Sequence, residues 1–135
     1  MDSPRLPAGV RATPQRQVIL ELVAAWRGSF TVQELHERAR RREPRLGLAT
    51  TYRTVELLRR SGEVHPLHPA AGGGRPAYVR CGPTHHHHLV CTSCGSVEDT
   101  DLCAAPAEAE VVRVHGFRPS AHELDIYGTC RRCAA

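Results

Sequence analysis

A run of four histidines leads directly into a C-x-x-C motif, and this stretch constrains the chain more than any other. It spans residues 85–94, and a second C-x-x-C motif follows near the end of the chain. Cysteine thiolates and imidazoles are the ligands that zinc and similar borderline metals prefer. Two C-x-x-C pairs in a short chain are typical of a closed four-thiolate site. The sequence therefore predicts a structural zinc site made by Cys91, Cys94, Cys130 and Cys133.

Closed tetrahedral coordination leaves no open position on the metal, so such a site serves structure and not catalysis. Its formation contributes on the order of 10 kcal/mol to folding. The alternatives are buried apolar cysteines or adventitious disulfides. Residues 1–14 show no signal-peptide pattern, and no apolar run approaches the length of a membrane span. We therefore expect a soluble, cytoplasmic protein whose six cysteines are metal ligands before disulfides.

Charge is distributed unevenly along the chain. Residues 1–80 contain 14 Arg and 7 acidic residues, whereas residues 81–135 contain 4 Arg and 7 acidic residues. A basic first half beside an acidic half rich in metal ligands indicates a nucleic-acid reader joined to a sensor or assembly module. The asymmetry alone is weak support, because many helical faces are simply well solvated.

Three helices and a hairpin are predicted in the first half. The first helix begins at the Thr13–Pro14 N-cap signal, and the second begins with the Thr31–Glu34 capping box. A third covers residues 49–60, and strands at 63–68 and 77–81 then form a β-hairpin wing. This order predicts a winged helix-turn-helix domain over residues 1–82.

The N-terminal residues of the second helix in a helix-turn-helix are aimed at base edges. Here these are the first residues of the third predicted helix, and nearby arginines are candidates for phosphate contacts. The predicted DNA-binding residues are Thr50, Thr51, Tyr52 and Arg53 at the groove, with Arg11, Arg16 and Arg59 on the backbone.

The remainder of the chain, residues 83–135, shows short β segments. We expect strands at 86–91, 96–99 and 120–127, with a helix at 104–114 before the last strand. These elements predict a small α/β domain with a three-stranded sheet, so that the fold class of the whole chain is α+β.

The histidine run can supply two metal sites. In a strand, successive side chains point to opposite faces, so His86 and His88 share one face. Cys81 lies just upstream, and we expect the wing hairpin to bring His65 beside it. These four residues predict a Cys-His₃ site at the hinge between the halves. The alternative is that His65 lies on the surface and that Cys81 is a small packed apolar residue.

His85 and His87 lie on the opposite face of the same strand, where His122 can join them. Cys103 is the favoured fourth ligand, and Asp101 and Glu108 are further candidates. A free buried thiol is an equally good interpretation of Cys103. Catalysis has little support, because the chain lacks a Gly-x-Ser-x-Gly motif, a His-Glu-x-x-His motif and a phosphate-binding glycine loop.

The order of these parts resembles the ferric uptake regulator family. The matching motifs are Arg11–Arg16 in the first helix, Leu48–Thr54 in the recognition helix and the histidine–cysteine stretch with its second C-x-x-C motif. Within the family, Val79–Cys81 and Ile126–Cys130 resemble the zinc uptake regulators. The resemblance covers nearly the whole chain.

The resemblance implies an N-terminal winged helix, a hinge and a C-terminal α/β dimerisation domain that binds metal. By position, the four cysteines of the C-x-x-C motifs are structural zinc ligands, and Cys81, His86 and His88 are regulatory ligands. His65 occupies a position where the family often has a carboxylate. His85, His87 and His122 match a second sensing site. The usual glutamate of that site has no counterpart near residues 104–106.

Together these features predict a homodimeric, zinc-dependent repressor of zinc uptake genes. It is expected to bind one structural and one or two regulatory Zn²⁺ per subunit and then to bind double-stranded, pseudo-palindromic operator DNA, with no membrane and no small-molecule substrate as partner. The alternatives are a sister sensor for iron, manganese, nickel or peroxide, a zinc hydrolase, and a zinc storage or delivery protein. A metal titration distinguishes a sister sensor, because a metal other than zinc would then restore DNA binding. Measurable turnover would indicate a hydrolase, and metal binding without operator selectivity would indicate a storage or delivery protein.

Overall fold

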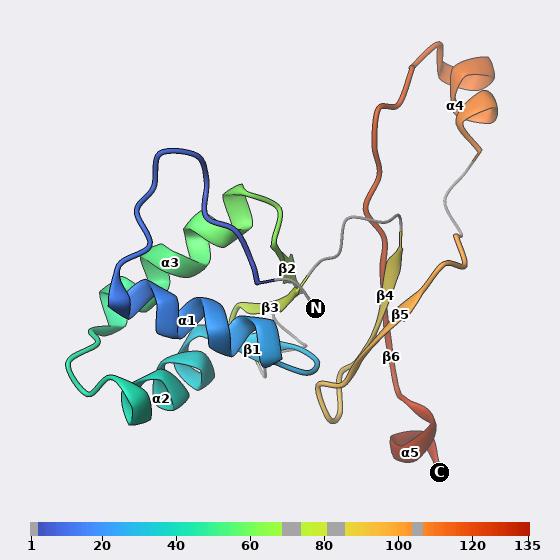
Figure 1. The fold of residues 1–135 in the computed structure, drawn as a ribbon. Coiled ribbons are helices and arrows are strands. Elements are labelled where there is room, and N and C mark those ends of the chain that lie inside the picture. The colour runs from blue at the N-terminus through green and yellow to red at the C-terminus, as the bar shows by residue number, and fades with distance from the viewer. Residues whose placement is uncertain (1–2, 69–73, 81–85, 104–106) are drawn as a thin grey trace.

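The structure is a computed structural model of the 135-residue chain, and it describes residues 3–68, 74–80, 86–103 and 107–135. Within these ranges the chain forms a helical half with one small sheet and a second half with another (Figure 1). None of the described helices is both long and apolar enough to cross a membrane.

The first half is built on α1 (Pro14–Ala25), α2 (Val32–Arg42) and α3 (Leu48–Arg60). Local hydrogen bonds fix the starts of the first two helices as predicted. The Thr13 hydroxyl accepts the Arg16 amide proton at 3.3 Å, and Thr31 and Glu34 form both bonds of a capping box. Apolar faces of the three helices meet in one core. Its buried members are Ile19, Leu20, Val23, Phe30, Val32, Leu35, Ala39, Leu46, Val55, Leu58 and Val64.

The wing is part of a three-stranded antiparallel sheet. Its strands are β1 (Phe30–Thr31), β2 (Val64–Leu67) and β3 (Ala77–Arg80), in the order β1-β3-β2. The β2–β3 hairpin confirms the predicted wing. β1 was not predicted, because two residues are too few to show an alternating pattern. The predicted loop residues 69–73 and the end of the second strand at residue 81 lie outside the described residues.

The second half contains β4 (His87–Cys91), β5 (Val97–Thr100) and β6 (Asp125–Gly128) in the order β5-β4-β6. β5 is antiparallel to β4, and β6 is parallel to it. β6 begins later than the predicted residue 120, because pairing with β4 starts at Asp125. The predicted helix appears as α4 (Glu108–His115), which has no buried residue. A short helix that was not predicted, α5 (Arg131–Ala134), follows β6.

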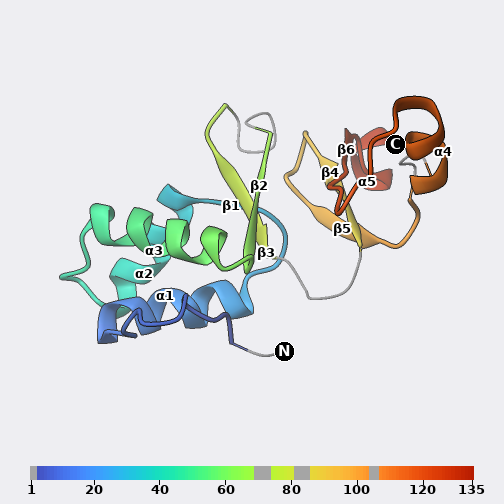
Figure 2. The same ribbon diagram turned by 90° about the horizontal axis from the view of Figure 1, so that it is seen from above.

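The two halves lie side by side, with the wing facing the second sheet (Figure 2). A small apolar cluster joins them, in which Leu67, Ala77 and Val79 of the wing pack with Val90 of β4 and Val97 of β5. The structure thus confirms an α+β fold with a winged helix-turn-helix and a small α/β domain. The boundary between residues 82 and 83 stays a prediction, because it falls among residues 81–85, which are not described.

Candidate metal centres and nucleic-acid interface

The four cysteines of the two C-x-x-C motifs come together at one end of the second sheet. Because β4 and β6 run parallel, the turn after β4 and the segment after β6 leave the sheet at the same end. The four sulfur atoms lie within 4.8 Å of one another, and all four residues are free thiols. A set of four clustered sulfur ligands with no other donor fits a structural zinc ion.

The cysteine pKa values show why this cluster favours a cation. The Cys130 amide donates to the Cys91 sulfur at 3.3 Å, and this hydrogen bond lowers the pKa of Cys91 to about 6. Hydrogen bonding with the Cys130 sulfur, followed by Cys94, raises the pKa of Cys133 to about 12. Cys91 therefore forms a thiolate readily, whereas deprotonation of Cys133 is favoured only when a positive charge lies among the sulfurs.

A second cluster lies between the wing and the second sheet. Asp125 Oδ2 is 2.9 Å from His65 Nε2, and Asp125 Oδ1 is 3.0 Å from His88 Nδ1. The three side chains come from β2, β4 and β6. All are largely buried, with 13% of His65, 6% of His88 and 13% of Asp125 exposed.

His88 also belongs to a group with His86 and Asp99, whose ligand atoms all lie within 4.8 Å. The His86 and His88 rings are 4.9 Å apart, and His88 Nε2 is 3.8 Å from Asp99 Oδ1. Within the described residues this buried nitrogen has no hydrogen-bond partner. Buried polar atoms are normally satisfied, so an orphaned imidazole nitrogen among other ligand groups fits a metal site.

A third cluster lies on the opposite face of β4. His87, Cys103 and His122 bring their ligand atoms within 4.8 Å of one another. The Cys103 sulfur is 3.3 Å from His122 Nε2, and the His87 and His122 rings stack with centroids 5.2 Å apart. Two imidazoles and a thiol are again ligands that suit zinc.

The N-terminal part of α3 presents some of the predicted DNA-binding residues and buries another. Tyr52 is 42% exposed, its hydroxyl accepts a 2.8 Å hydrogen bond from Gln33, and Arg53 is also exposed. Thr50 is half-buried. Thr51 is fully buried, and its hydroxyl lies 3.0 Å from His36 Nδ1. This side chain joins α3 to α2 inside the core and is not presented to solvent, so the burial does not support a DNA contact by Thr51, which stays a prediction.

The three arginines predicted to contact phosphates differ in their surroundings. Arg11 is exposed. The Arg16 guanidinium donates to the Arg11 carbonyl at 2.8 Å, which links these two basic residues at the start of α1. Arg59 forms a hydrogen-bonded ion pair with Glu56, with Nε 2.9 Å from the carboxylate. Arg59 is thus the weakest candidate, because Glu56 already balances its charge.

The chain matches the ferric uptake regulator family over residues 7–127. This protein is a member of the ferric uptake regulator family. The zinc uptake regulation protein of Mycobacterium tuberculosis is 44% identical over 127 residues, which cover 93% of this chain and 96% of that protein. The peroxide operon regulator of Bacillus subtilis is 32% identical over 128 residues, with 93% and 86% covered. The solved structure of a zinc-bound manganese uptake regulator matches with a TM-score of 0.62 at 30% identity, covering 90% of this chain and 92% of that one.

In this ferric uptake regulator family member, the predicted hinge ligands are only partly described. The structure groups His65 with His88 and Asp125, and His86 with His88 and Asp99, whereas Cys81 lies outside the described residues. In the second predicted set, His87, Cys103 and His122 come together, and His85 lies outside the description. The further candidates Asp101 and Glu108 are not part of this cluster in the described residues.

Sequence reasoning missed two carboxylates of this family member, Asp99 and Asp125. Both are directly opposite His88 in the sheet, Asp99 on β5 and Asp125 on β6. Neighbouring residues on adjacent strands point to the same face, so the three side chains form one row. The strand register carries this information. The signal in the sequence was the alternation of side chains along each strand, which indicates the residues of the two neighbouring strands that share a face with His88.

Proposed function

We propose that this family member is a zinc-responsive transcriptional repressor that controls zinc uptake genes. It binds operator DNA as a homodimer when its regulatory sites hold zinc. The observation that carries this proposal is that His88 is shared by two ligand groups, one with His65 and Asp125 and one with His86 and Asp99. We call these five residues together the hinge cluster, and its histidines come from both halves of the molecule. His65 belongs to the wing of the DNA-binding half, and His86 and His88 belong to the second half. A metal held by both sets of ligands fixes the angle between DNA reader and dimer core.

Zinc is the metal that the donor sets favour. The proposed structural site is Cys91, Cys94, Cys130 and Cys133, a soft four-sulfur set. Histidine-rich regulatory clusters also suit zinc, and the 44% identical relative is named a zinc uptake regulation protein. We assign one structural zinc and one or two regulatory zinc ions to each subunit.

The hinge site is proposed to consist of His65, Cys81, His86 and His88, with Asp99 and Asp125 beside them. Zinc supplies a positive charge with a preference for tetrahedral coordination. The ligands come from both halves, so the arrangement with the wing held against the second sheet binds zinc more tightly than an open arrangement does. Occupancy therefore shifts the population toward the closed arrangement. Coupling is reciprocal, so operator DNA tightens zinc binding.

The second regulatory site is proposed to consist of His87, Cys103 and His122, with His85 as the fourth ligand. Its members come from β4, from the segment after β5 and from the segment before β6. Binding there ties together segments that lie near α4, and this supports a role in grading the response or strengthening the dimer.

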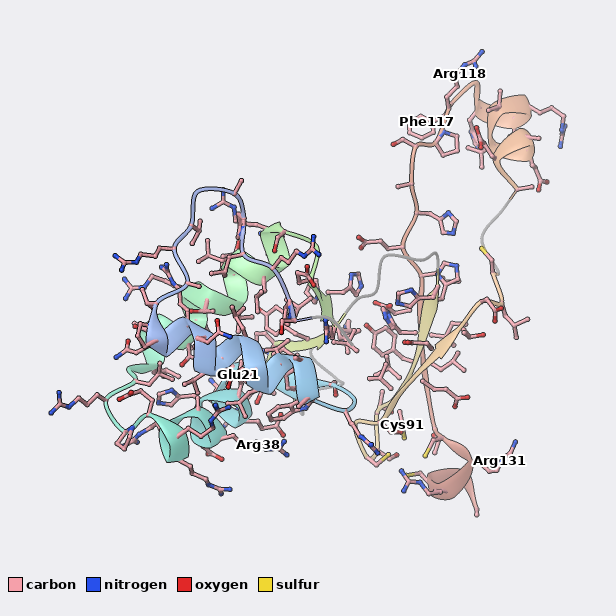
Figure 3. All side chains as sticks on the ribbon, viewed as in Figure 1. Glu21, Arg38, Cys91, Phe117, Arg118 and Arg131 are labelled. Atoms are coloured by element: carbon pink, nitrogen blue, oxygen red, sulfur yellow. The ribbon has the colours of Figure 1, made fainter. Side chains whose placement is uncertain are left out.

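A homodimer is supported by apolar surface on the second half. Leu89 and Ile126 are neighbours on one sheet face and are 36% and 43% exposed. Val114, at the end of α4, is 55% exposed. Phe117, just after α4, is 64% exposed (Figure 3). Adjoining exposed apolar residues of this size mark interaction surfaces. Two copies of the winged helix then place their α3 helices in successive major grooves of a pseudo-palindromic operator.

On DNA, Tyr52 and Arg53 are the proposed base contacts, with Thr50 at the edge of the groove. Arg11 and Arg16 are the proposed phosphate contacts, and Arg59 contributes only if its pair with Glu56 opens. A repressor of this kind acts in the cytoplasm. Enzymatic turnover and metal storage are the less favoured functions, because a closed cysteine site and a DNA reader serve neither.

One alternative has specific support. The relatives include a peroxide operon regulator and a zinc-bound manganese uptake regulator, so a sister sensor for another metal is the second candidate. Hard metals such as manganese favour oxygen ligands. The carboxylates Asp99 and Asp125 beside His88 are the feature that favours this candidate.

The deciding experiment measures operator binding against buffered free zinc, with iron(II), manganese(II) and nickel(II) in parallel. Each sample also receives a metal count per subunit. We expect that only zinc restores specific binding and that about one zinc per subunit survives mild chelation. A stronger response to another metal identifies a sister sensor. Binding that no metal changes overturns the regulator proposal.

A further inference from the structure

The carboxylate of Asp125 contacts one histidine from each half of the molecule. Its Oδ2 atom lies 2.9 Å from Nε2 of His65 in the wing, and its Oδ1 atom lies 3.0 Å from Nδ1 of His88 in β4. Only 13% of the Asp125 side chain is exposed. A buried carboxylate that uses both oxygens on ring nitrogens is a strong orienting group, because charge-assisted hydrogen bonds are short and directional.

The backbone of Asp125 is fixed by the second sheet. Asp125 opens β6 and pairs in register with His88 in the parallel β4–β6 ladder. On the other side of β4, Asp99 of β5 is paired with the same histidine. His88 is therefore flanked by two carboxylates. Asp125 lies beside its Nδ1 atom, and Asp99 lies beside its Nε2 atom.

The two ring nitrogens of His88 differ in their contacts. With Asp125 accepting a hydrogen bond, Nδ1 carries the proton, which leaves the lone pair on Nε2. Nε2 is buried, has no hydrogen-bond partner in the described part of the chain and faces His86 and Asp99. Metal-ligating histidines commonly donate their other ring N–H to a carboxylate, and this fixes both tautomer and ring orientation.

His65 is held by the same group. Its Nε2 faces Asp125, its Nδ1 lies 3.5 Å from the 78% exposed Glu123, and its ring centroid is 5.6 Å from that of His88. Asp125 thus aligns a strand of the wing with the strand that carries the histidine run. The position of the wing relative to the second sheet is thus set in part by Asp125, which lies beside the proposed metal ligands.

We propose that Asp125 is a positioning residue of the hinge site. It presents Nε2 of His88 to the metal and keeps His65 of the wing beside it, without itself binding the metal. The inference rests on the proposed function, since it assigns a role to Asp125 in the regulatory site described there.

The test uses the full-length dimer with its tightly held zinc, in a His122→Ala background so that the second regulatory site does not titrate. Two-dimensional ¹H–¹⁵N spectra of the imidazoles, recorded without regulatory metal at pH 8, report the tautomer of His88. Zinc affinity is measured by competition with a chromophoric chelator in the absence of DNA. We expect the Nδ1–H tautomer in the parent and the Nε2–H tautomer in Asp125→Ala, with zinc affinity about 10- to 100-fold weaker.

Two further variants separate positioning from folding and from ligation. Asp125→Asn keeps an acceptor oxygen, so we expect it to preserve the Nδ1–H tautomer, most of the zinc affinity and the cobalt(II) absorption spectrum of the site. Glu123 contacts His65 and not His88. In the control variant Glu123→Gln the His88 tautomer should therefore not change. A cobalt(II) spectrum altered by Asp125→Asn shows that Asp125 is a ligand and overturns the proposal.

The remaining outcomes are equally decisive. An Nε2–H tautomer in the parent protein, or zinc affinity in Asp125→Ala within twofold of the parent, overturns the inference and leaves the proposed function intact. If the parent binds no zinc beyond the tightly held ion, the regulatory site itself fails, and with it the proposed function. If Asp125→Ala does not fold, the parent tautomer and the Asp125→Asn variant still decide.

Discussion

The Ser29 hydroxyl donates a hydrogen bond of 2.8 Å to the carbonyl oxygen of Gly95. Ser29 lies in the turn between α1 and β1, and Gly95 follows the Cys91–Cys94 turn. Gly28 lies against the same turn with φ +77°, a conformation that favours glycine, and a Cβ there would be 3.6 Å from the Gly95 carbonyl oxygen. The four-cysteine cluster therefore abuts the DNA-binding half at a point separate from the hinge.

Ser29→Ala should weaken operator binding at saturating zinc by about 2- to 10-fold, because a typical hydrogen bond contributes about 0.5–1.5 kcal/mol to the arrangement it stabilises. Zinc content should not change. The measurement is the operator Kd, with the exposed Ser120→Ala as the matched control. Equal Kd values for the Ser29 and Ser120 variants would show that this contact does not influence the DNA-binding arrangement.

Cys94→Ser should remove the tightly held zinc and convert the dimer into partly unfolded monomer, because the closed site loses one of four ligands and with it most of about 10 kcal/mol of folding free energy. Zinc counting, sedimentation and thermal melting test this. Cys103→Ser, which lies outside this cluster, is the control: it should keep the four-cysteine zinc and, with the regulatory sites left empty, should melt as the parent does. A Cys94→Ser dimer with a native melting curve would contradict the structural assignment.

His86→Ala should leave folding and dimer formation unchanged and raise the zinc concentration for half-maximal operator binding by at least about 10-fold. The reason is that His86 faces Nε2 of His88 in the hinge cluster. His115→Ala, at the exposed end of α4, serves as the control. An unchanged zinc midpoint for His86→Ala would remove this residue from the hinge site.

Cys103→Ser and His122→Ala should each lower the zinc content by one ion per subunit and leave the four-cysteine zinc and the hinge zinc in place. Both side chains belong to the third cluster, where their ligand atoms are 3.3 Å apart. Elemental analysis at saturating free zinc measures the loss, and operator titration shows whether the response becomes shallower. Full zinc content in both variants would mean that this cluster is not a metal site.

Arg53→Ala should weaken binding to the specific operator by about 1–3 kcal/mol if the guanidinium reads a guanine. Binding to random DNA should change much less. Arg113→Ala on α4 is the control, because that arginine is exposed and distant in sequence from the reader. Equal losses on operator and random DNA would reassign Arg53 to a phosphate contact.

The sequence by itself determined the features that depend on near neighbours. The starts of α1 and α2 follow from hydrogen bonds that span three residues, Thr13 to Arg16 and Thr31 to Glu34. The four-cysteine cluster was predictable because two C-x-x-C motifs each present a pair of sulfurs to one point. Strand alternation likewise placed His87 and His88 toward different partners, His122 and His65.

Only the tertiary structure decided which distant groups meet these residues. Asp125 reaches His88 across 37 residues, and Ser29 reaches Gly95 across 66. Parallel pairing of β4 with β6 sets the first contact, and packing of the wing on the second sheet brings the halves close enough for the second. Burial of Thr51 was decided in the same way, by how α3 packs on α2. Caps and short motifs act through hydrogen bonds within a few residues, whereas strand register and helix packing are settled by burying apolar side chains over the whole chain.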